Sequence, residues 1–251
     1  MIIQKIVLGS NPFFDAYFHA DLLGKLIFIG LFILSIVTWT LIIHKVRVSR
    51  RVKELAVHFQ TAFKNQAQQP LSVEYQRQIH REFSHPFYEL YKTLRKHTLE
   101  VLNKNRAFAS NAQINLPAGS SYLGSSDIEL IESHLASSIA SHTQVLEKNL
   151  FILSTVVTLA PFLGLLGTVW GILTTFSELQ AQTISNTNQA VLHGLSLALA
   201  TTVLGLIDAI PALIGYNYLK NTFGDFRREM ENFANKILSV VELHYRKVET
   251  I

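Results

Sequence analysis

Three long apolar runs constrain what this chain can fold into more than any other feature of its sequence. Residues 26–43 form the first run, LIFIGLFILSIVTWTLII, whose 18 residues carry no charge. As a helix this run is about 27 Å long, which just spans the hydrocarbon core of a bilayer. The second run, residues 149–177, is also uncharged, and the third, residues 189–219, is interrupted by Asp208 alone. Both exceed the ~20 residues of a membrane span, so we predict an all-α protein with three transmembrane helices.

The distribution of positive charge orients these spans in the lipid bilayer. Two of the 22 Lys and Arg residues precede the first span, fourteen lie in residues 44–150, none lies in residues 178–188, and six follow residue 219. By the positive-inside rule the basic segments face the cytoplasm, while the N-terminus and the short connection between the second and third spans face outward. Topology therefore explains the net charge of +4, and we predict no nucleic-acid partner.

The spans divide the chain into seven segments with long cytoplasmic helical extensions. We predict a periplasmic N-terminal segment (1–25), the first span (26–43), a cytoplasmic helical domain (44–148), the second span (149–177), a short periplasmic loop (178–188), the third span (189–219) and a cytoplasmic C-terminal helix (220–251). A cleavable signal peptide is the alternative for the first run. That run is longer than the usual apolar stretch of about 7 to 15 residues, and no small-residue cleavage site follows it.

Hydrophobic residues outside the spans recur at helical spacing, which predicts helices that pack on one another. The stripes comprise Val52, Leu55, Ala56, Phe59 and Phe63; Phe83, Phe87, Leu90, Tyr91, Leu94, Val101 and Leu102; and Phe226, Met230, Phe233, Ile237 and His244. We expect breaks at residues 66–70 and 110–126. Asp127 is the expected N-cap of a helix that can run through Leu150 into the second span, and the third span should continue as a helix into the tail.

The sequence offers no catalytic or metal-binding pattern. The chain has no cysteine, which excludes disulfides, thiolate nucleophiles and cysteine-held metal clusters. It has no HExxH, no GxSxG and no glycine-rich phosphate loop, and His80 and His85 flank Pro86 without the spacing of helical ligands. We therefore predict no enzyme activity, no metal and no cofactor.

Small residues recur along the second span, where they allow close approach of a neighbouring helix. They are Ala160, Gly164, Gly167 and Gly171, and the last two form a GxxxG pair. Lipid supplies no hydrophobic drive for helix association, so small residues at this spacing favour tight packing. Simple packing is the alternative to a functional role. Pro161 is likewise either a tolerated kink or a hinge.

Hydroxyl side chains and one acid are the polar groups of the spans. The hydroxyls are Ser154, Thr155, Thr158, Thr168, Thr174 and Thr175 in the second span, and Ser196, Thr201 and Thr202 in the third. They either line a polar path between subunits or bond to their own backbone. Asp208 is costly in lipid, so it either faces a bundle interior or stays hydrated near the inner interface, while His193 is expected at the outer interface.

Two motifs resemble a known family. APFLGLLGTVWGI at residues 160–172 and GLSLALATTVLGLIDAIPALIGYN at residues 194–217 resemble the TolQ/ExbB proton-channel family, which is distantly related to MotA. SIVTWTLIIHK at residues 35–45 resembles the first span of that family, and the short N-terminal segment is more similar to TolQ than to ExbB. Thr168 and Thr202 match the pore threonines of the family, and Pro161 matches its proline.

The resemblance implies a partner system. It implies an inner-membrane homo-pentamer around two helices of a TolR/ExbD-type single-span protein, whose own Asp carries protons. The proton motive force then energises a TolA- or TonB-type protein that acts on the outer membrane. We expect Thr168, Thr175, Thr201, Thr202 and Asp208 to line the proton pathway. A passive membrane scaffold without ion conduction is the alternative.

One position departs from the family pattern. The family carries a Glu in the third span, within GIAEAL, where this chain has GLSLAL and therefore Leu197. Eleven residues at about 100° each place Asp208 on nearly the same face as Leu197, roughly 16 Å further along the helix. We hypothesise that Asp208 supplies part of the missing acidity from a different depth.

Overall fold

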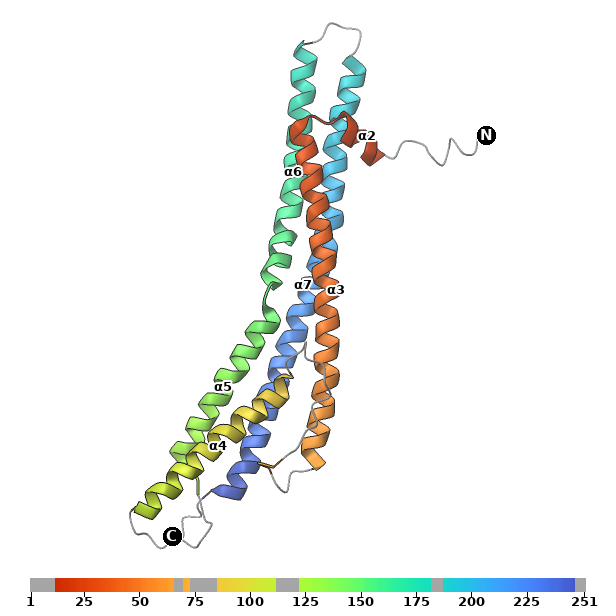
Figure 1. Ribbon diagram of the computed structural model, residues 1–251. Coiled ribbons are helices and arrows are strands. Elements are labelled where there is room, and N and C mark those ends of the chain that lie inside the picture. Colours follow the sequence, from red (N-terminus) through yellow and green to blue (C-terminus); the bar gives the residue numbers. More distant parts are fainter. Residues whose placement is uncertain (1–11, 66–69, 73–84, 112–121, 182–186, 247–251) are drawn as a thin grey trace. The chain divides into compact units, whose positions relative to one another are not determined.

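The computed structural model describes residues 12–65, 70–72, 85–111, 122–181 and 187–246, and its regular elements in those ranges are all helices. They are α2 (Pro12–His19), α3 (Leu22–Asn65), α4 (Pro86–Asn111), α5 (Ser125–Glu147), α6 (Leu150–Ala181) and α7 (Thr187–Tyr245). Figure 1 shows α3 and α7 as the longest rods. Three of the helices (α3, α6 and α7) are long and apolar enough to cross a membrane, so the predicted fold class is confirmed.

Two helices are much longer than a membrane span. α3 has 44 residues and α7 has 59 residues, which at 1.5 Å per residue correspond to about 66 Å and 88 Å. A hydrocarbon core is about 30 Å thick, so each helix extends well beyond it. The predicted helical continuation of the third span into the tail is therefore confirmed, because α7 is unbroken to Tyr245. The chain divides into unit 1 (Met1–Val46 and Asn149–Leu219) and unit 2 (Arg47–Lys148 and Lys220–Ile251).

Unit 1 is built from α2, the first part of α3, α6 and the first part of α7. Its buried cluster joins Ala16 and Ala20 to Phe28 of α3 and to Leu197 and Ala200 of α7. Many of its large apolar side chains point outward, as lipid-facing residues of a membrane helix do. α2 therefore packs against two of the three apolar helices.

The start of α3 is fixed by one carboxylate. The backbone N–H of Gly24 donates to Asp21 Oδ1 at 3.0 Å, which caps the first turn. The indole Nε1–H of Trp170 in α6 donates to the other oxygen, Asp21 Oδ2, at 2.8 Å. His19, at the end of α2, has its ring 4.1 Å from that of His193 in α7. These two contacts tie the α2–α3 corner to α6 and α7.

Unit 2 contains a buried aromatic core. The rings of Phe59, Phe63, Phe87, Tyr91 and Phe233 pack mostly edge to face, and the Phe59–Phe233 ring centroids are 5.8 Å apart. All five side chains are buried. The predicted stripes are thus confirmed at the described positions, with Leu55 only half-buried. Phe83 lies outside the described residues, and His244 is exposed, so the stripe of the tail ends before it.

Two expectations about α5 are wrong. Its N-cap is Gly124, and Asp127 lies in the first turn, where its carboxylate accepts the N–H of Gly124 at 2.9 Å. This position also lets Asp127 accept a hydrogen bond from Asn105 of α4. The helix ends at Glu147 and does not run into α6, because Asn149 adopts a φ of 70°. Asn is among the few residues that tolerate this left-handed conformation, so the break has a local cause.

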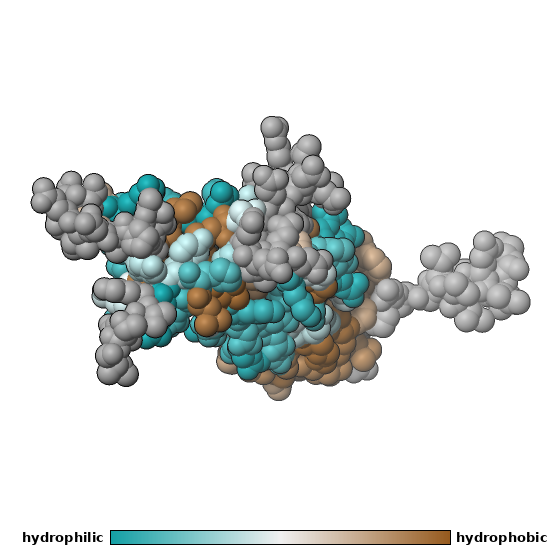
Figure 2. All heavy atoms as spheres, turned by 90° about the horizontal axis from the view of Figure 1, so that it is seen from below, coloured by the Kyte–Doolittle hydropathy of each residue, from teal (hydrophilic) through white to brown (hydrophobic). Residues whose placement is uncertain are grey.

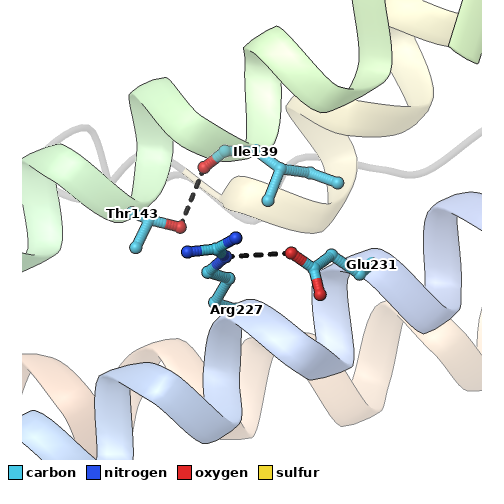
Figure 3. A network of polar contacts seen from close by, with 4 residues as sticks. All are labelled: Ile139, Thr143, Arg227 and Glu231. Carbon is cyan, nitrogen blue, oxygen red and sulfur yellow. Dashed lines mark hydrogen bonds and ion pairs between the residues drawn. The ribbon is translucent and has the colours of Figure 1, made fainter. Parts of the chain in front are cut away.

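A groove separates α5 from α7 within unit 2. It encloses about 530 Å³ and is lined by residues of these two helices. Figure 3 shows the Arg227 guanidinium lying beside Thr143, whose hydroxyl donates to the Ile139 carbonyl at 2.9 Å. Arg227 is paired with Glu231 of its own helix at 2.9 Å.

Seen from below, hydrophilic residues cover much of the described surface, and hydrophobic residues gather toward one side (Figure 2).

Candidate functional site

The helices α6 and α7 approach each other along a stripe of small residues that we call the small-residue seam. It comprises Ala160, Gly164, Gly167 and Gly171 of α6, and Gly194, Ala198, Thr201 and Gly205 of α7. The pairing of Ala160 with Gly205 at one end and of Gly171 with Gly194 at the other shows that the helices are antiparallel. A β-carbon at Gly205 would lie 2.6 Å from the Ala160 carbonyl oxygen, and one at Gly167 would overlap the Thr201 side chain. Only glycine fits at these two positions.

Two threonines of α7 direct their hydroxyls at α6. The Thr202 hydroxyl donates to the Gly164 carbonyl oxygen at 3.1 Å. The Thr201 hydroxyl lies 3.5 Å from the same oxygen and 3.0 Å from the Leu197 and Ala198 carbonyl oxygens of its own helix. Thr201 is completely buried, whereas Thr202 is partly accessible. The seam therefore concentrates hydroxyl oxygens and backbone carbonyls at one point between two apolar helices.

The hydroxyls of α6 bond to their own backbone. Thr168 donates to the Leu165 carbonyl oxygen at 2.6 Å, and Thr175 donates to that of Gly171 at 2.7 Å. Thr155, Thr158 and Thr174 also donate to carbonyls three or four residues earlier. Thr175 is buried at the end of the seam, and Thr168 is half-buried at its flank. A hydroxyl that donates in this way keeps lone pairs that can accept a further hydrogen bond.

Pro161 lies inside α6 next to Ala160 of the seam, and the helix continues through it. The missing N–H of a proline frees one carbonyl of the preceding turn, which in a membrane helix is usually satisfied by neighbours. The structure therefore places all of the predicted packing residues, namely Pro161, Gly164, Gly167 and Gly171, on or beside the α7-facing side of α6.

Asp208 lies one heptad beyond Thr201, on nearly the same face of α7, whereas Thr202 lies about 120° away around the helix. Its carboxylate is hydrogen-bonded to the hydroxyl of Ser35 in α3, and the residue is 7% exposed. Leu197 lies on the same side, because it packs with Phe28 of α3, as the eleven-residue spacing predicted. The structure thus brings Thr201 and Thr202 together with the glycines of α6, and it places Asp208 on the side that faces α3.

Three residues of the seam were missed by sequence reasoning. Gly194, Ala198 and Gly205 of α7 face the small residues of α6. Their spacing of four residues, from 194 to 198 and from Thr201 to Gly205, is the same small-xxx-small signal that was applied to the second span alone. The hydrogen bond from Trp170 to Asp21 had no sequence signal, because the two residues are 149 positions apart.

The described part of the chain holds no group of three His, Asp or Glu residues that could bind a metal ion. The chemistry of the site is therefore that of hydroxyls, backbone carbonyls and one carboxylate in an apolar surrounding. Such groups accept and pass hydrogen bonds, and they line ion pathways in membrane proteins.

The chain is similar to proteins named ExbB and TolQ. The chain is 28% identical over 226 residues to the biopolymer transport protein ExbB of Salmonella typhimurium, which covers 88% of this chain and 83% of that protein. It is 28% identical over 230 residues to ExbB of Pseudomonas putida, of which it spans 62%. It is also 35% identical over 96 residues to the Tol-Pal system protein TolQ of Haemophilus influenzae, which is 38% of this chain and 42% of that one.

A family model matches the same region as the seam. Residues 102–232 match the MotA/TolQ/ExbB proton channel family, and this range includes the whole of α6 and most of α7. The match covers slightly more than half of the chain. The predicted resemblance is therefore confirmed, and the chain belongs to the MotA/TolQ/ExbB proton channel family.

Proposed function

We propose that this protein is the membrane-embedded subunit of a proton-driven machine that energises a partner protein. The observation that carries the proposal is the small-residue seam, where the buried Thr201 and the accessible Thr202 gather around the Gly164 carbonyl of α6. Membership of a proton channel family supports it. The family is not a known enzyme family, which agrees with the absence of catalytic motifs.

The chemistry of the seam suits a proton that is carried by another chain. A protonated carboxyl group of a partner helix can donate to the Thr202 or Thr168 hydroxyl, since each hydroxyl keeps an acceptor lone pair while it bonds to a carbonyl. Passage of one proton charge releases about 2.3 kcal/mol per 100 mV. Several protons per cycle therefore supply enough free energy to move one set of helices against another.

The proposed partners are those that the resemblance to TolQ and ExbB implies. We place the spans at residues 26–43, 149–177 and 189–219 of an inner-membrane protein whose N-terminus is periplasmic and whose C-terminus is cytoplasmic. The partner is a TolR/ExbD-type single-span protein held within a homo-pentamer of this chain. The energised component is of the TolA or TonB type, and relatives named TolQ and ExbB are compatible with either system.

Asp208 is proposed to provide acidity that the third span otherwise lacks. Leu197 occupies the position of the family's Glu, and Asp208 is the one acid among the described residues 191–219 of α7. It is bonded to Ser35 of α3 and does not contact the threonines of the seam. If it serves the pathway, Asp208→Asn lowers flux. Unchanged flux in this variant, with flux lost in Thr168→Ala, would remove Asp208 from the pathway.

The proposal is tested by co-reconstitution with a TolR/ExbD-type partner in vesicles, with proton flux read from an interior pH dye. Thr202→Val removes a hydroxyl and keeps the side-chain shape, so we expect flux to fall about tenfold, which corresponds to the roughly 1.4 kcal/mol of one hydrogen bond between the helices. Thr202→Ser should restore it. Thr155→Val is the matched control, because Thr155 is an exposed threonine of α6 whose hydroxyl donates to the Phe151 carbonyl of its own helix.

A passive scaffold is the second candidate, and one observation favours it. The hydroxyls of Thr168, Thr175, Thr201 and Thr202 all donate to backbone carbonyls, as they do in threonines that only pack. A scaffold without ion conduction predicts that Thr202→Val, Thr168→Val and Thr155→Val all leave partner activity at the wild-type level. The proton channel predicts loss in the first two variants alone.

A further inference from the structure

A groove of about 450 Å³ lies within unit 1, between α2, α3 and α7. Its walls are aromatic and aliphatic side chains of α2, α3 and α7, including Phe13, Tyr17, Phe28 and Phe32. Phe32 is 68% exposed, so the groove opens to the surroundings of the helices, where lipid would lie. The groove is therefore large, apolar and accessible from one side.

Among the described residues that line this groove, one is charged. Asp208 lies at the same end as Ser35, which supplies the hydroxyl bonded to its carboxylate. The described lining residues include no Lys or Arg. A carboxylate that is taken out of water gains most from a charged hydrogen-bond partner, and a single neutral hydroxyl satisfies only part of its acceptor capacity. The groove thus has the shape for an apolar chain and an unmatched negative charge at one end.

We propose that this groove binds an amphiphilic amine, with its ammonium group on the Asp208 carboxylate and its alkyl chain along the aromatic walls. The ammonium donates to the carboxylate oxygens that Ser35 leaves open. Phe28 and Tyr17 lie further along the groove, where they offer apolar surface to the alkyl chain. The inference does not depend on proton conduction, because it needs only the carboxylate and the groove.

Charge selectivity distinguishes this ligand from an ordinary acyl chain. A lipid tail would fill the groove without regard to its polar end, whereas the site described here prefers an amine to an alcohol of equal length. The ammonium can come from a free amine or from the headgroup of phosphatidylethanolamine. The two sources share one chemistry, and they differ in whether bilayer lipid competes for the groove.

The test uses dodecylamine and dodecanol that carry a photoreactive diazirine, added to the full-length protein in maltoside micelles. We expect the amine to label peptides of α3 and α7 that contain Phe32 and Ile207 about tenfold more than the alcohol does. Asp208→Asn should abolish this preference, and Asp208→Glu should retain it. Asp21→Asn is the matched control, because Asp21 is an acid of the same unit outside the groove.

Two further measurements identify the molecule that occupies the groove and keep the test independent of whether an Asp208 variant folds. Ile207 lines the groove and is 53% exposed, so Ile207→Trp should narrow it without burying a larger side chain, and amine labelling should fall. Competition by phosphatidylethanolamine, but not by phosphatidylglycerol, identifies the lipid headgroup as the source; competition by dodecylamine alone identifies a free amine. Equal labelling by amine and alcohol, amine preference retained in Asp208→Asn, or labelling unchanged in Ile207→Trp overturns the proposal.

Discussion

Inside each of the two units, the helices pack against one another through a different kind of side chain. In unit 1, α6 and α7 meet through glycine, alanine and threonine, and their backbones are close enough that Thr202 bonds directly to the Gly164 carbonyl. In unit 2, the helices are held apart by rings, and Phe59 and Phe63 each pack against both Tyr91 and Phe233. One chain, and in part the same helices, thus uses two packing schemes.

The solvent explains the difference. Unit 1 contains the helices that are apolar enough to cross a membrane, and lipid gives no reward for burying a large apolar side chain. Close contact between backbones and polar bonds between helices then decide the packing. Unit 2 carries most of the charged residues. Removing the apolar surface of its rings from water contributes roughly 25 cal/mol per Å². Large side chains in the seam of unit 1, or small side chains in the aromatic core of unit 2, should therefore lower the stability of that unit.

The largest effect should come from the aromatic core. Phe59→Ala removes a fully buried ring that contacts Phe233, and such truncations cost about 3–5 kcal/mol. We expect the thermal midpoint of unit 2 to fall, as followed by hydrogen exchange of α4 and α5 amides. Val57→Ala is the control, because Val57 is 59% exposed on the same helix and should change stability by less than about 0.5 kcal/mol. Equal losses in both variants would contradict an aromatic core.

A smaller loss of stability is expected from one methyl group added to the small-residue seam. Gly167→Ala places a β-carbon onto the Thr201 side chain, and overpacking of this kind costs about 1–3 kcal/mol. The measurement is thermal unfolding in detergent. Gly30→Ala is the matched control, because no atom lies within 4 Å of the added carbon and alanine favours the helix. If Gly30→Ala is the more damaging of the two, α6 and α7 do not approach as closely as described.

The sequence predicted the packing of each unit to a different extent. Periodicity alone identified Phe59, Phe63 and Phe233, because water imposes a helical repeat on buried residues. In the seam it identified Gly167 and Gly171 of α6, but their partners on α7 were missed. A hydroxyl such as that of Thr201 can face a neighbour or its own backbone at the same spacing. The pairing of Asp208 with Ser35, and the left-handed Asn149, depend on tertiary contacts and on backbone geometry that periodicity does not encode.

Acidification should weaken unit 2 through its histidines. His85 caps α4, because its Nδ1 accepts the N–H of Tyr88 at 3.2 Å, and its Nε2 lies 3.0 Å from the Leu55 carbonyl oxygen. Burial lowers the pKa of His85 below its usual value, and burial also lowers the pKa of His97 and of His142. The folded state therefore favours the neutral form of these rings. Their contribution to stability is complete above about pH 6.5 and is lost as the pH falls from there through the lower folded pKa.

Because His85 caps α4, its contribution can be measured separately from that of the other histidines. His85→Asn keeps a side chain that can cap the helix but cannot take up a proton, so it should reduce the acid-induced loss, with an effect of about 1 kcal/mol at low pH. Hydrogen exchange of the Tyr88 amide, corrected for the intrinsic pH dependence of exchange, measures it. His58→Asn, at an exposed histidine of α3, is the control. A pH profile that is the same for wild type and His85→Asn would mean that the cap does not respond to acid.

The smallest effect tests whether charge adds to the packing of unit 2. Arg227 and Glu231 are paired at 2.9 Å beside the α5–α7 groove (Figure 3), but their side chains are 61% and 43% exposed. Exposed pairs one helical turn apart contribute only about 0.3–0.5 kcal/mol, because water and salt screen them. A double-mutant cycle of Arg227→Ala and Glu231→Ala should give a coupling of this size, and it should disappear at high salt. A coupling comparable to the cost of Phe59→Ala would mean that ion pairs, and not the aromatic rings alone, hold unit 2 together, and the contrast between the two units would then have to be drawn from charge as well as from side-chain volume.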